Sequence, residues 1–426
     1  MNSLEKNPWR PQDEGDHHPV MKEWWTIENT FKTDDKRKWN LMSSFAHEME
    51  TPSCFFQYVL FDITSKKCVL HSDINTSFDK LTYKKNRIDL KFRDSSLKGL
   101  YPEYQIHIED KEQEFTADIE FKAQSLPHWI TQDITGGYLP IGLNYYRYGF
   151  LPNCNSTGTL TINNKQYKTK GKGYLEHAWG NWSYQNPFQK IADLKKTISV
   201  YSRLGKWWLS HHKVHVPKSI SFSTDNNAFG YDWIWGVFDN DWSMFFGNSM
   251  FWVSNGPSFG ALYITADGKK YWEFCNLKFQ YNKLNYIKKY DIYYPTDMEI
   301  TGILEDKKIN LRFWTTVEPY VYTSPYEKDR FYKAFVLIEE PGKMKGTFSD
   351  SEKTIELTGD CKLVPLRQPS FLGHNSISFN FLKPPKGFGV DIDFCSHFIN
   401  RKISSKIYFA PRPHFKFNIE KIPKNK

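Results

Sequence analysis

The chain has 426 residues, with 39% hydrophobic and 25% charged side chains and a formal net charge of +9. This length suggests two domains, and the composition fits neither a disordered chain nor a membrane bundle. No run of about 18 apolar residues is present, so no transmembrane helix is predicted. The charges are scattered, whereas nucleic-acid-binding proteins concentrate basic residues, and we expect no nucleic-acid partner.

The N-terminal residues 1–20 are polar and are expected to form a loose arm. They lack the apolar segment of a secretory signal, which favours a cytoplasmic location. None of the six cysteines forms a Cys-x-x-Cys pair. We therefore expect reduced thiols and neither a zinc ribbon nor a thioredoxin-type site. The mild basic excess leaves peripheral contact with an anionic membrane surface open.

Alternating apolar and polar residues recur along most of the chain and predict many short strands. Aromatic residues make up 17% of the sequence and favour strands over helices. Alternating runs at 104–108 and 115–121 flank the polar turn 110–113, which is typical of a hairpin. The Asp-Gly pair at 267–268 predicts another hairpin. Evenly spaced short strands favour an all-β barrel or sandwich.

Residues 183–220 interrupt this alternation. Apolar residues at 191, 194, 198 and 201 have roughly helical spacing, and an aromatic, basic segment follows at 206–212. Two interpretations stay open: an ordinary insertion packed on the barrel, or a lid that contacts a membrane through residues 186–215. His211 and His215 are spaced for one face of a helix, but a third ligand is not evident, and we expect no metal.

Three aromatic motifs follow one another in the first part of the chain. They are Glu23-Trp24-Trp25, Glu176-His177-Ala178-Trp179-Gly180 and Tyr231-Asp232-Trp233. Neighbouring side chains of a strand point to opposite faces. We therefore expect His177 and Trp179 to line a cavity together, with Glu176 on the other face. In the same way, Asp232 and Trp233 should lie on opposite faces.

The order of these motifs resembles that of the AttH-like and carotenoid hydratase superfamily. The resemblance rests on motifs from Glu23 to Asp241, and beyond them on length and strand pattern. It implies two lipocalin-like β-barrels side by side, which we place at residues 21–240 and 241–426. It also implies a large apolar ligand. Members include carotenoid and kievitone hydratases, cyclases and pericyclic enzymes, and some relatives handle lipids without catalysis.

The function implied by the resemblance is a cofactor-independent enzyme that hydrates, cyclises or isomerises a C=C bond of a long isoprenoid-like substrate. Protonating such a bond requires a strong acid, and a carboxylic acid kept neutral by apolar surroundings can supply the proton. Aromatic faces can stabilise the resulting cation by about 1–2 kcal/mol each. The alternative is a lipid or terpenoid carrier without catalysis. An acid that faces the apolar cavity would favour the enzyme.

By resemblance to the carotenoid hydratases, Asp232 is the candidate acid and His177 a second catalytic residue. Each also has a structural interpretation: His177 could hydrogen-bond a strand end, Asp232 could pair with a lysine, and Glu23 could pair with Arg147. No phosphate loop or dinucleotide motif is present. Glycoside hydrolysis by two carboxylates stays open, although the motifs argue against it. The expected substrate-binding residues are Glu23, Trp25, Tyr146, Tyr174, Trp179, Tyr231 and Trp233.

Overall fold

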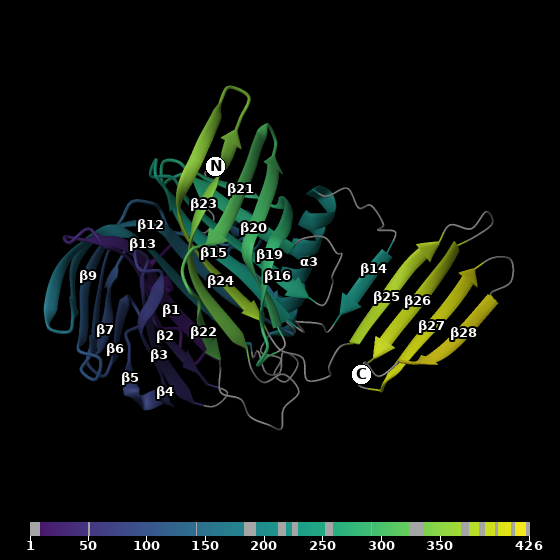
Figure 1. The fold of residues 1–426 in the computed structure, drawn as a ribbon, viewed down its shortest axis with the longest axis horizontal. Coiled ribbons are helices and arrows are strands. Elements are labelled where there is room, and N and C mark those ends of the chain that lie inside the picture. Colours follow the sequence, from purple (N-terminus) through teal and green to yellow (C-terminus); the bar gives the residue numbers. More distant parts are fainter. Residues whose placement is uncertain are drawn as a thin grey trace.

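The protein is built almost entirely from antiparallel strands. A computed structural model describes residues 9–49, 52–141, 143–182, 193–211, 219–223, 229–251, 259–290, 292–323, 335–367, 375–382, 388–396, 399–409 and 414–422. In this part of the chain the strands form three sheets (Figure 1), so the predicted all-β fold is confirmed. The helical segments are η1 (Pro11–Asp13), η2 (Phe78–Lys80), α2 (Gln132–Thr135) and α3 (Leu194–His211).

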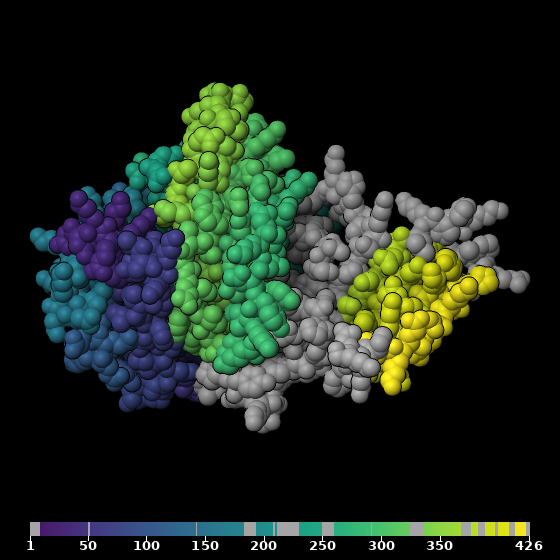
Figure 2. Space-filling view, viewed as in Figure 1, coloured from purple at the N-terminus to yellow at the C-terminus, as the bar shows by residue number. Residues whose placement is uncertain are grey.

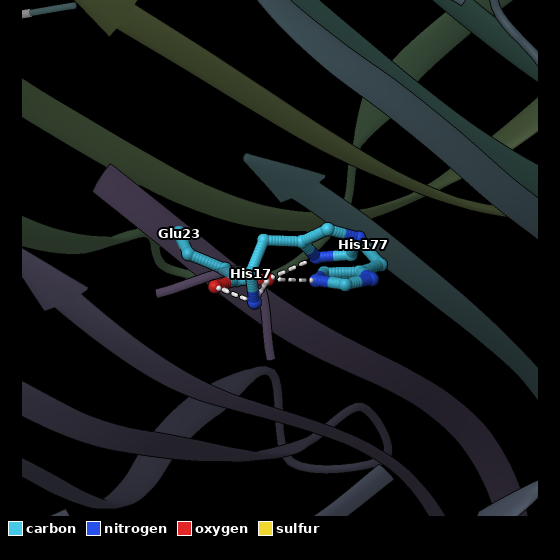
Figure 3. Close-up of side chains that lie close together, drawn as sticks. All are labelled: His17, Glu23 and His177. Atoms are coloured by element: carbon cyan, nitrogen blue, oxygen red, sulfur yellow. Dashed lines mark hydrogen bonds and ion pairs between the residues drawn. The ribbon is translucent and has the colours of Figure 1, made fainter. Parts of the chain in front are cut away.

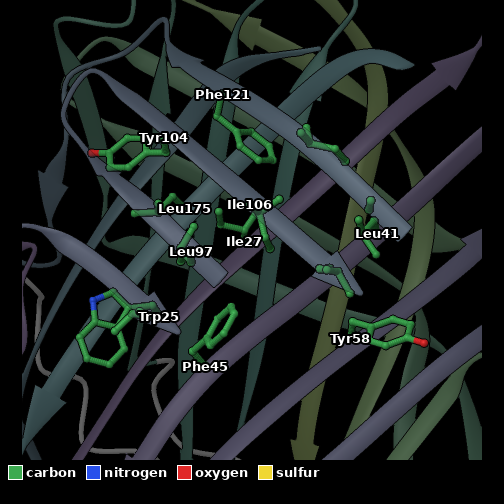
Figure 4. Packing of buried hydrophobic residues seen from close by; sticks show 14 of the residues in the cluster. Trp25, Ile27, Leu41, Phe45, Tyr58, Leu97, Tyr104, Ile106, Phe121 and Leu175 are labelled. Carbon is green, nitrogen blue, oxygen red and sulfur yellow. The ribbon is translucent and has the colours of Figure 1, made fainter. Parts of the chain in front are cut away.

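The first sheet curls around an apolar core that includes Trp25, Ile27, Phe45 and Leu175 (Figure 4). Its strand order is β4-β3-β2-β1-β13-β12-β9-β8-β7-β6-β5, with β10 and β11 paired to β12. We call this sheet and its core the first barrel. Its strands are β1 (Lys22–Thr33), β2 (Lys38–Glu48), β3 (Ser53–Asp62), β4 (Lys67–Ser77), β5 (Leu81–Thr82), β6 (Ile88–Phe92), β7 (Ser95–Leu100), β8 (Glu103–Asp110), β9 (Phe115–Ala123), β10 (His128–Trp129), β11 (Tyr138–Ile141), β12 (Asn144–Ile162) and β13 (Lys165–Gly180).

The second sheet curls around its own core, which includes Ile234, Phe246, Leu311 and Leu363. Its order is β18-β17-β16-β15-β24-β23-β21-β20-β19, with β22 paired to β23. We call it the second barrel, and it lies beside the first (Figure 2). Its strands are β15 (Phe229–Phe238), β16 (Ser243–Phe251), β17 (Phe259–Thr265), β18 (Tyr271–Phe274), β19 (Asn276–Ile287), β20 (Ile292–Leu304), β21 (Lys307–Thr315), β22 (Tyr320–Thr323), β23 (Val336–Ser349) and β24 (Thr354–Arg367).

Both predicted hairpins are present. The runs at 104–108 and 115–121 form β8 and β9, which pair as neighbours. The Asp-Gly turn connects β17 to β18. Gly268 has a φ of 70° there, a left-handed conformation that glycine adopts without steric cost.

The strand just before the expected boundary near residue 240 belongs to the second barrel. β15 carries the Tyr231-Asp232-Trp233 motif, and it pairs with β16 and β24 in the second barrel. In the described residues, the last strand of the first barrel in chain order is β13, which ends at Gly180. The pairing of β15 with β24 joins segments far apart in the sequence, and local alternation carries no sign of it.

The C-terminal part of the expected second barrel forms a separate third sheet. Its order is β14-β25-β26-β27-β28. β14 comes from the segment between the two barrels, so this sheet combines distant parts of the chain. Its strands are β14 (Ser219–Ser223), β25 (Asn375–Leu382), β26 (Phe388–Ser396), β27 (Arg401–Phe409) and β28 (His414–Lys421).

The expectation of a loose N-terminal arm is wrong for residues 9–20. Glu14 is 1% exposed and accepts hydrogen bonds from the Trp9 indole N–H (2.8 Å) and the Tyr101 backbone N–H (3.1 Å). The Trp9 ring occupies the space that a Cβ at Gly149 would fill. Asp13 forms a 2.6 Å ion pair with Arg147. These contacts hold the segment against β12 and the β7–β8 turn.

A third apolar core joins the two barrels. Tyr148, Phe150 and Tyr174 of the first barrel pack against Trp233 and Phe245 of the second. Because side chains alternate along β13, the face that leaves the first core enters this interface. Residues at the interface therefore contact both barrels at once.

Candidate functional site

β13 separates two buried polar clusters. His177 points into the first barrel, where its ring stacks on Trp25 and lies near Trp179, with centroid distances of 4.6 Å in both cases. Glu176 points the other way and contacts Trp233 of the second barrel. The expectation that His177 and Trp179 share a face opposite Glu176 agrees with these contacts. One strand thus contributes to two different candidate sites.

The cluster inside the first barrel is centred on Glu23, which is fully buried. Its Oε1 lies 2.8 Å from His177 Nε2 and 2.8 Å from His17 Nδ1 (Figure 3). Its Oε2 lies 3.0 Å from His47 Nε2, which is also 3.2 Å from Asp16 Oδ1. The β1–β13 and β1–β2 registers explain the convergence, because Glu23 is opposite Trp179 on one side and His47 on the other.

Burial and charge act against each other in this first-barrel cluster. Burial raises the pKa of Glu23, but contacts with three histidine rings hold that pKa well below its usual value. Burial lowers the pKa of His47, yet Asp16 and Glu23 outweigh it and raise the pKa to about 9. Burial dominates at His177 and lowers its pKa. Glu23 is therefore a carboxylate surrounded by imidazole rings. Arg147, its expected partner, forms an ion pair with Asp13 instead.

The cluster between the barrels is centred on Glu176, which is 7% exposed. Its Oε1 accepts a hydrogen bond from Trp24 Nε1 at 2.9 Å. Its Oε2 accepts hydrogen bonds from the Tyr174 hydroxyl (2.9 Å), Trp233 Nε1 (3.1 Å) and the Tyr148 hydroxyl. Burial raises the pKa of Glu176 above its ordinary value despite these donors. The group is an acid surrounded by aromatic rings.

The aromatic rings around Glu176 reach the molecular surface at one edge. Trp24, Tyr146 and Tyr231 are only half-buried, and they pack against the fully buried part of the interface. Tyr146 lies 5.2 Å from Trp182 between ring centroids, and Trp24 lies 5.3 Å from the same ring. Trp24 and Tyr146, which both contact the Trp182 ring, form a partly exposed edge of the interface beside Glu176.

Asp232 lies in neither cluster. It is buried on the inner face of the second barrel, where Oδ1 forms a 2.6 Å ion pair with Arg367. Its Oδ2 accepts hydrogen bonds from Asn248 Nδ2 (3.2 Å) and the Tyr281 hydroxyl. Trp233 lies on the opposite face, as expected, and this face enters the interface between the barrels. Asp232 thus faces a guanidinium group and does not share a site with His177.

The structure divides the predicted site residues into three groups. Glu23, Trp25, His177 and Trp179 belong to the first barrel, and Asp232 belongs to the second. The interface brings together Tyr146, Tyr174, Tyr231 and Trp233. Sequence reasoning missed Glu176 as an acid, and it missed Asp16, His17, His47, Tyr148 and Trp24 as partners. The run Asp16-His17-His18 just before Glu23 was the available signal for the histidines.

Two sets of side chains in the described part of the chain have metal-ligand geometry. They are His17, Glu23 and His177, and Asp16, Glu23 and His47, with ligand atoms within 4.8 Å of one another in each set. Both sets share Glu23. The pair considered from sequence, His211 and His215, lies outside the side chains that the structure describes.

The predicted insertion contains one long helix, α3, within its described residues. Leu194, Ile198, Tyr201 and Leu209 are exposed, and their spacing places them on one face. None of the described helices is long and apolar enough to cross a membrane. Residues 183–192 and 212–218 of the insertion lie outside the described part of the chain.

No family model matches the sequence, and neither does any curated protein. Solved structures do share its fold. An AttH-type protein from Nitrosomonas europaea is 13% identical with a TM-score of 0.56, over 83% of this chain and 95% of that chain. Kievitone hydratase from Nectria haematococca is 12% identical with a TM-score of 0.52, over 84% and 98%. CghA is 9% identical with a TM-score of 0.50, over 83% and 89%.

At these identities the likeness concerns the fold. The three proteins belong to the AttH and carotenoid hydratase superfamily, which was the resemblance seen in the motifs. The chain therefore has the double lipocalin-like fold of the AttH and carotenoid hydratase superfamily.

Proposed function

We propose that this protein is an enzyme of the hydratase or cyclase type that protonates a C=C bond of an apolar, isoprenoid-like substrate, with Glu176 as the acid. The observation that carries the proposal is the position of Glu176 in the aromatic interface between the barrels. Burial raises its pKa, which favours the neutral acid that this chemistry requires. Kievitone hydratase, a hydratase by name, has the same fold and supports the reaction class.

The proposed reaction needs a proton donor and a site for the cation. The Glu176 carboxyl group gives its proton to one carbon of the double bond, and a positive charge forms on the neighbouring carbon. Trp24 and Trp233 each donate a hydrogen bond from the indole N–H to the Glu176 carboxyl group. Their ring faces would stabilise a nearby cation by about 1–2 kcal/mol each.

The two product classes differ in what attacks the cation. In hydration, a water molecule adds its oxygen to the cationic carbon and returns one proton to the Glu176 carboxylate. In cyclisation, a second double bond of the substrate attacks, and loss of a proton from carbon restores the acid. Both sequences regenerate the enzyme without a redox step or a cofactor.

The sequence motifs placed the acid at Asp232, and the geometry favours Glu176 instead. Asp232 is paired with Arg367, whereas the partners of Glu176 are indole and phenol groups. A neutral acid is favoured where burial is not compensated by a cation. His177 then acts from the opposite face of β13 as a residue that holds the strand and the N-terminal segment.

The test is deuterium incorporation. The purified chain is incubated in D2O with a panel of acyclic isoprenoid polyenes, and the products are analysed by mass spectrometry. A turned-over substrate carries deuterium on carbon, and Glu176→Gln abolishes this incorporation while the exposed Glu120→Gln on β9 retains it. Retention of a polyene without any deuterium on carbon would instead favour the carrier function.

A further inference from the structure

The contact between His177 and Glu23 brings two hydrogen-bond acceptors together. His177 Nδ1 lies 2.8 Å from the backbone carbonyl oxygen of Asp13. A carbonyl oxygen only accepts hydrogen bonds, so Nδ1 must carry the hydrogen. In the neutral ring, Nε2 then presents a lone pair. That lone pair faces Glu23 Oε1 at 2.8 Å, and an ionised carboxylate also only accepts.

Two acceptors at this distance repel each other unless a cation lies on or between them. A metal ion bound to both atoms would accept a lone pair from each and remove this repulsion.

A third ligand is already in place. His17 Nδ1 lies 2.8 Å from the same oxygen, Glu23 Oε1, and the three ligand atoms lie within 4.8 Å of one another. The His17 ring is stacked on Trp179 at 3.8 Å between centroids and 9° between planes. This stacking fixes the direction of Nδ1. The His17 side chain is 22% exposed, which gives an ion access from solvent.

The surroundings also resemble those of a metal centre. Histidines that ligate metals usually donate their other ring N–H to a carbonyl or carboxylate group. His177 does so to Asp13. The other oxygen of Glu23, Oε2, accepts a hydrogen bond from the His17 backbone N–H and contacts His47, which also contacts Asp16. The ligand set and its supporting partners are therefore both present.

We propose that His17, Glu23 and His177 bind one divalent transition-metal ion, with zinc as the preferred ion. Two imidazoles and one carboxylate are a common zinc ligand set. The ion would connect the N-terminal segment, through His17, to β1 and β13, and so close this end of the first barrel. It lies on the face of β13 opposite Glu176, so this inference is independent of the proposed reaction.

The test uses the full chain without a histidine tag, dialysed against EDTA and then titrated with zinc chloride. We expect about one zinc ion per chain by elemental mass spectrometry, with a rise in melting temperature on zinc addition. His17→Gln and His177→Gln lose stoichiometric zinc. His47→Gln, which removes a supporting partner, binds zinc roughly 10–100-fold more weakly.

The control is His107→Gln, a half-buried histidine of β8 that pairs with Asp118 away from the cluster. It should bind zinc as the unaltered chain does. His17→Gln is the decisive variant if His177→Gln fails to fold, because His17 lies nearer the surface. Absence of bound zinc in the unaltered chain, or equal zinc binding by folded His17→Gln, overturns the proposal.

Discussion

Glu176 and His177 are neighbours in β13, yet their side chains enter two different buried clusters. The hydrogen-bond partners of Glu176 differ from those of His177. Glu176 meets Tyr148, Tyr174 and Trp233 between the barrels. His177 meets Glu23 and the Asp13 carbonyl inside the first barrel. Substitutions at these two adjacent positions should therefore have separable effects, one on chemistry and one on metal binding and the N-terminal segment.

The first prediction concerns the acid itself. Glu176→Gln keeps the shape and one acceptor oxygen but removes the transferable proton. Loss of a general acid typically lowers the rate by about 10²–10⁴-fold. We expect such a loss in kcat for deuterium incorporation. The melting temperature should fall modestly, because the amide NH2 group cannot accept the hydrogen bond from Trp24 Nε1, but the protein should remain folded. Glu120→Gln is the matched control, and a fully active Glu176→Gln variant would remove Glu176 from the mechanism.

The second prediction concerns Asp232. Asp232→Asn leaves the buried Arg367 guanidinium without its carboxylate partner. Breaking a buried pair by removing one member costs about 3–5 kcal/mol. Urea unfolding should show a loss of that order. Asp94→Asn, which breaks the exposed pair with Lys111, should leave the free energy of unfolding nearly unchanged. A stable but inactive Asp232→Asn variant would restore Asp232 as the catalytic acid.

Local features of the sequence predicted the strands and the direction of their side chains. The alternation at 104–108 and 115–121 gave a hairpin that the structure contains. The opposite faces of Glu176 and His177 followed from the geometry of any strand. These features depend on neighbouring residues alone, which is why they could be read without knowing the fold.

Contacts between residues that are distant in the sequence could not be predicted from such local features. Arg367 is 135 residues from Asp232, and no local pattern connects the two. The burial of Glu14 depends on Trp9 and on the backbone of Tyr101, contacts that exist only after the first barrel has curled. The polar N-terminal segment therefore looked like a loose arm, because its acids are satisfied by partners distant in sequence.

A third prediction follows from Glu273, a half-buried acid of β18. Burial raises its pKa to about 7, above the usual value of a free glutamate. The folded state thus keeps a proton that the unfolded chain has already lost, so stability falls as pH rises from about 4.5 to 7 and then levels off. Each pKa unit corresponds to about 1.4 kcal/mol.

Glu273→Gln removes this contribution while its side-chain oxygen can still accept the Tyr263 hydroxyl bond. The variant should lose less stability than the unaltered chain between pH 5 and 7, as measured by urea unfolding at several pH values. Glu356→Gln, at an exposed position of β24, should follow the unaltered chain. Parallel pH curves for all three proteins would contradict the assignment of this acid.

The last prediction concerns α3 and the membrane contact suggested for residues 186–215. Ile198 and Leu209 are 57% and 63% exposed on its apolar face. The helix carries Lys195, Lys196, Arg203 and Lys206 and no acidic residue. An exposed apolar stripe on a basic helix is typical of segments that bind anionic lipid surfaces. We therefore expect the chain to co-sediment with vesicles that contain phosphatidylserine.

The binding should depend on both the apolar face and the charge. Ile198→Ser combined with Leu209→Ser removes apolar area that would enter the lipid, so the bound fraction should fall severalfold. Raised salt should weaken binding because it screens the lysines from the lipid charge. Ser199→Ala, beside Ile198 but off the apolar stripe, is the matched control. If the double variant sediments like the control, α3 is an ordinary surface helix, and the apolar substrate reaches the Trp24 edge directly from solution.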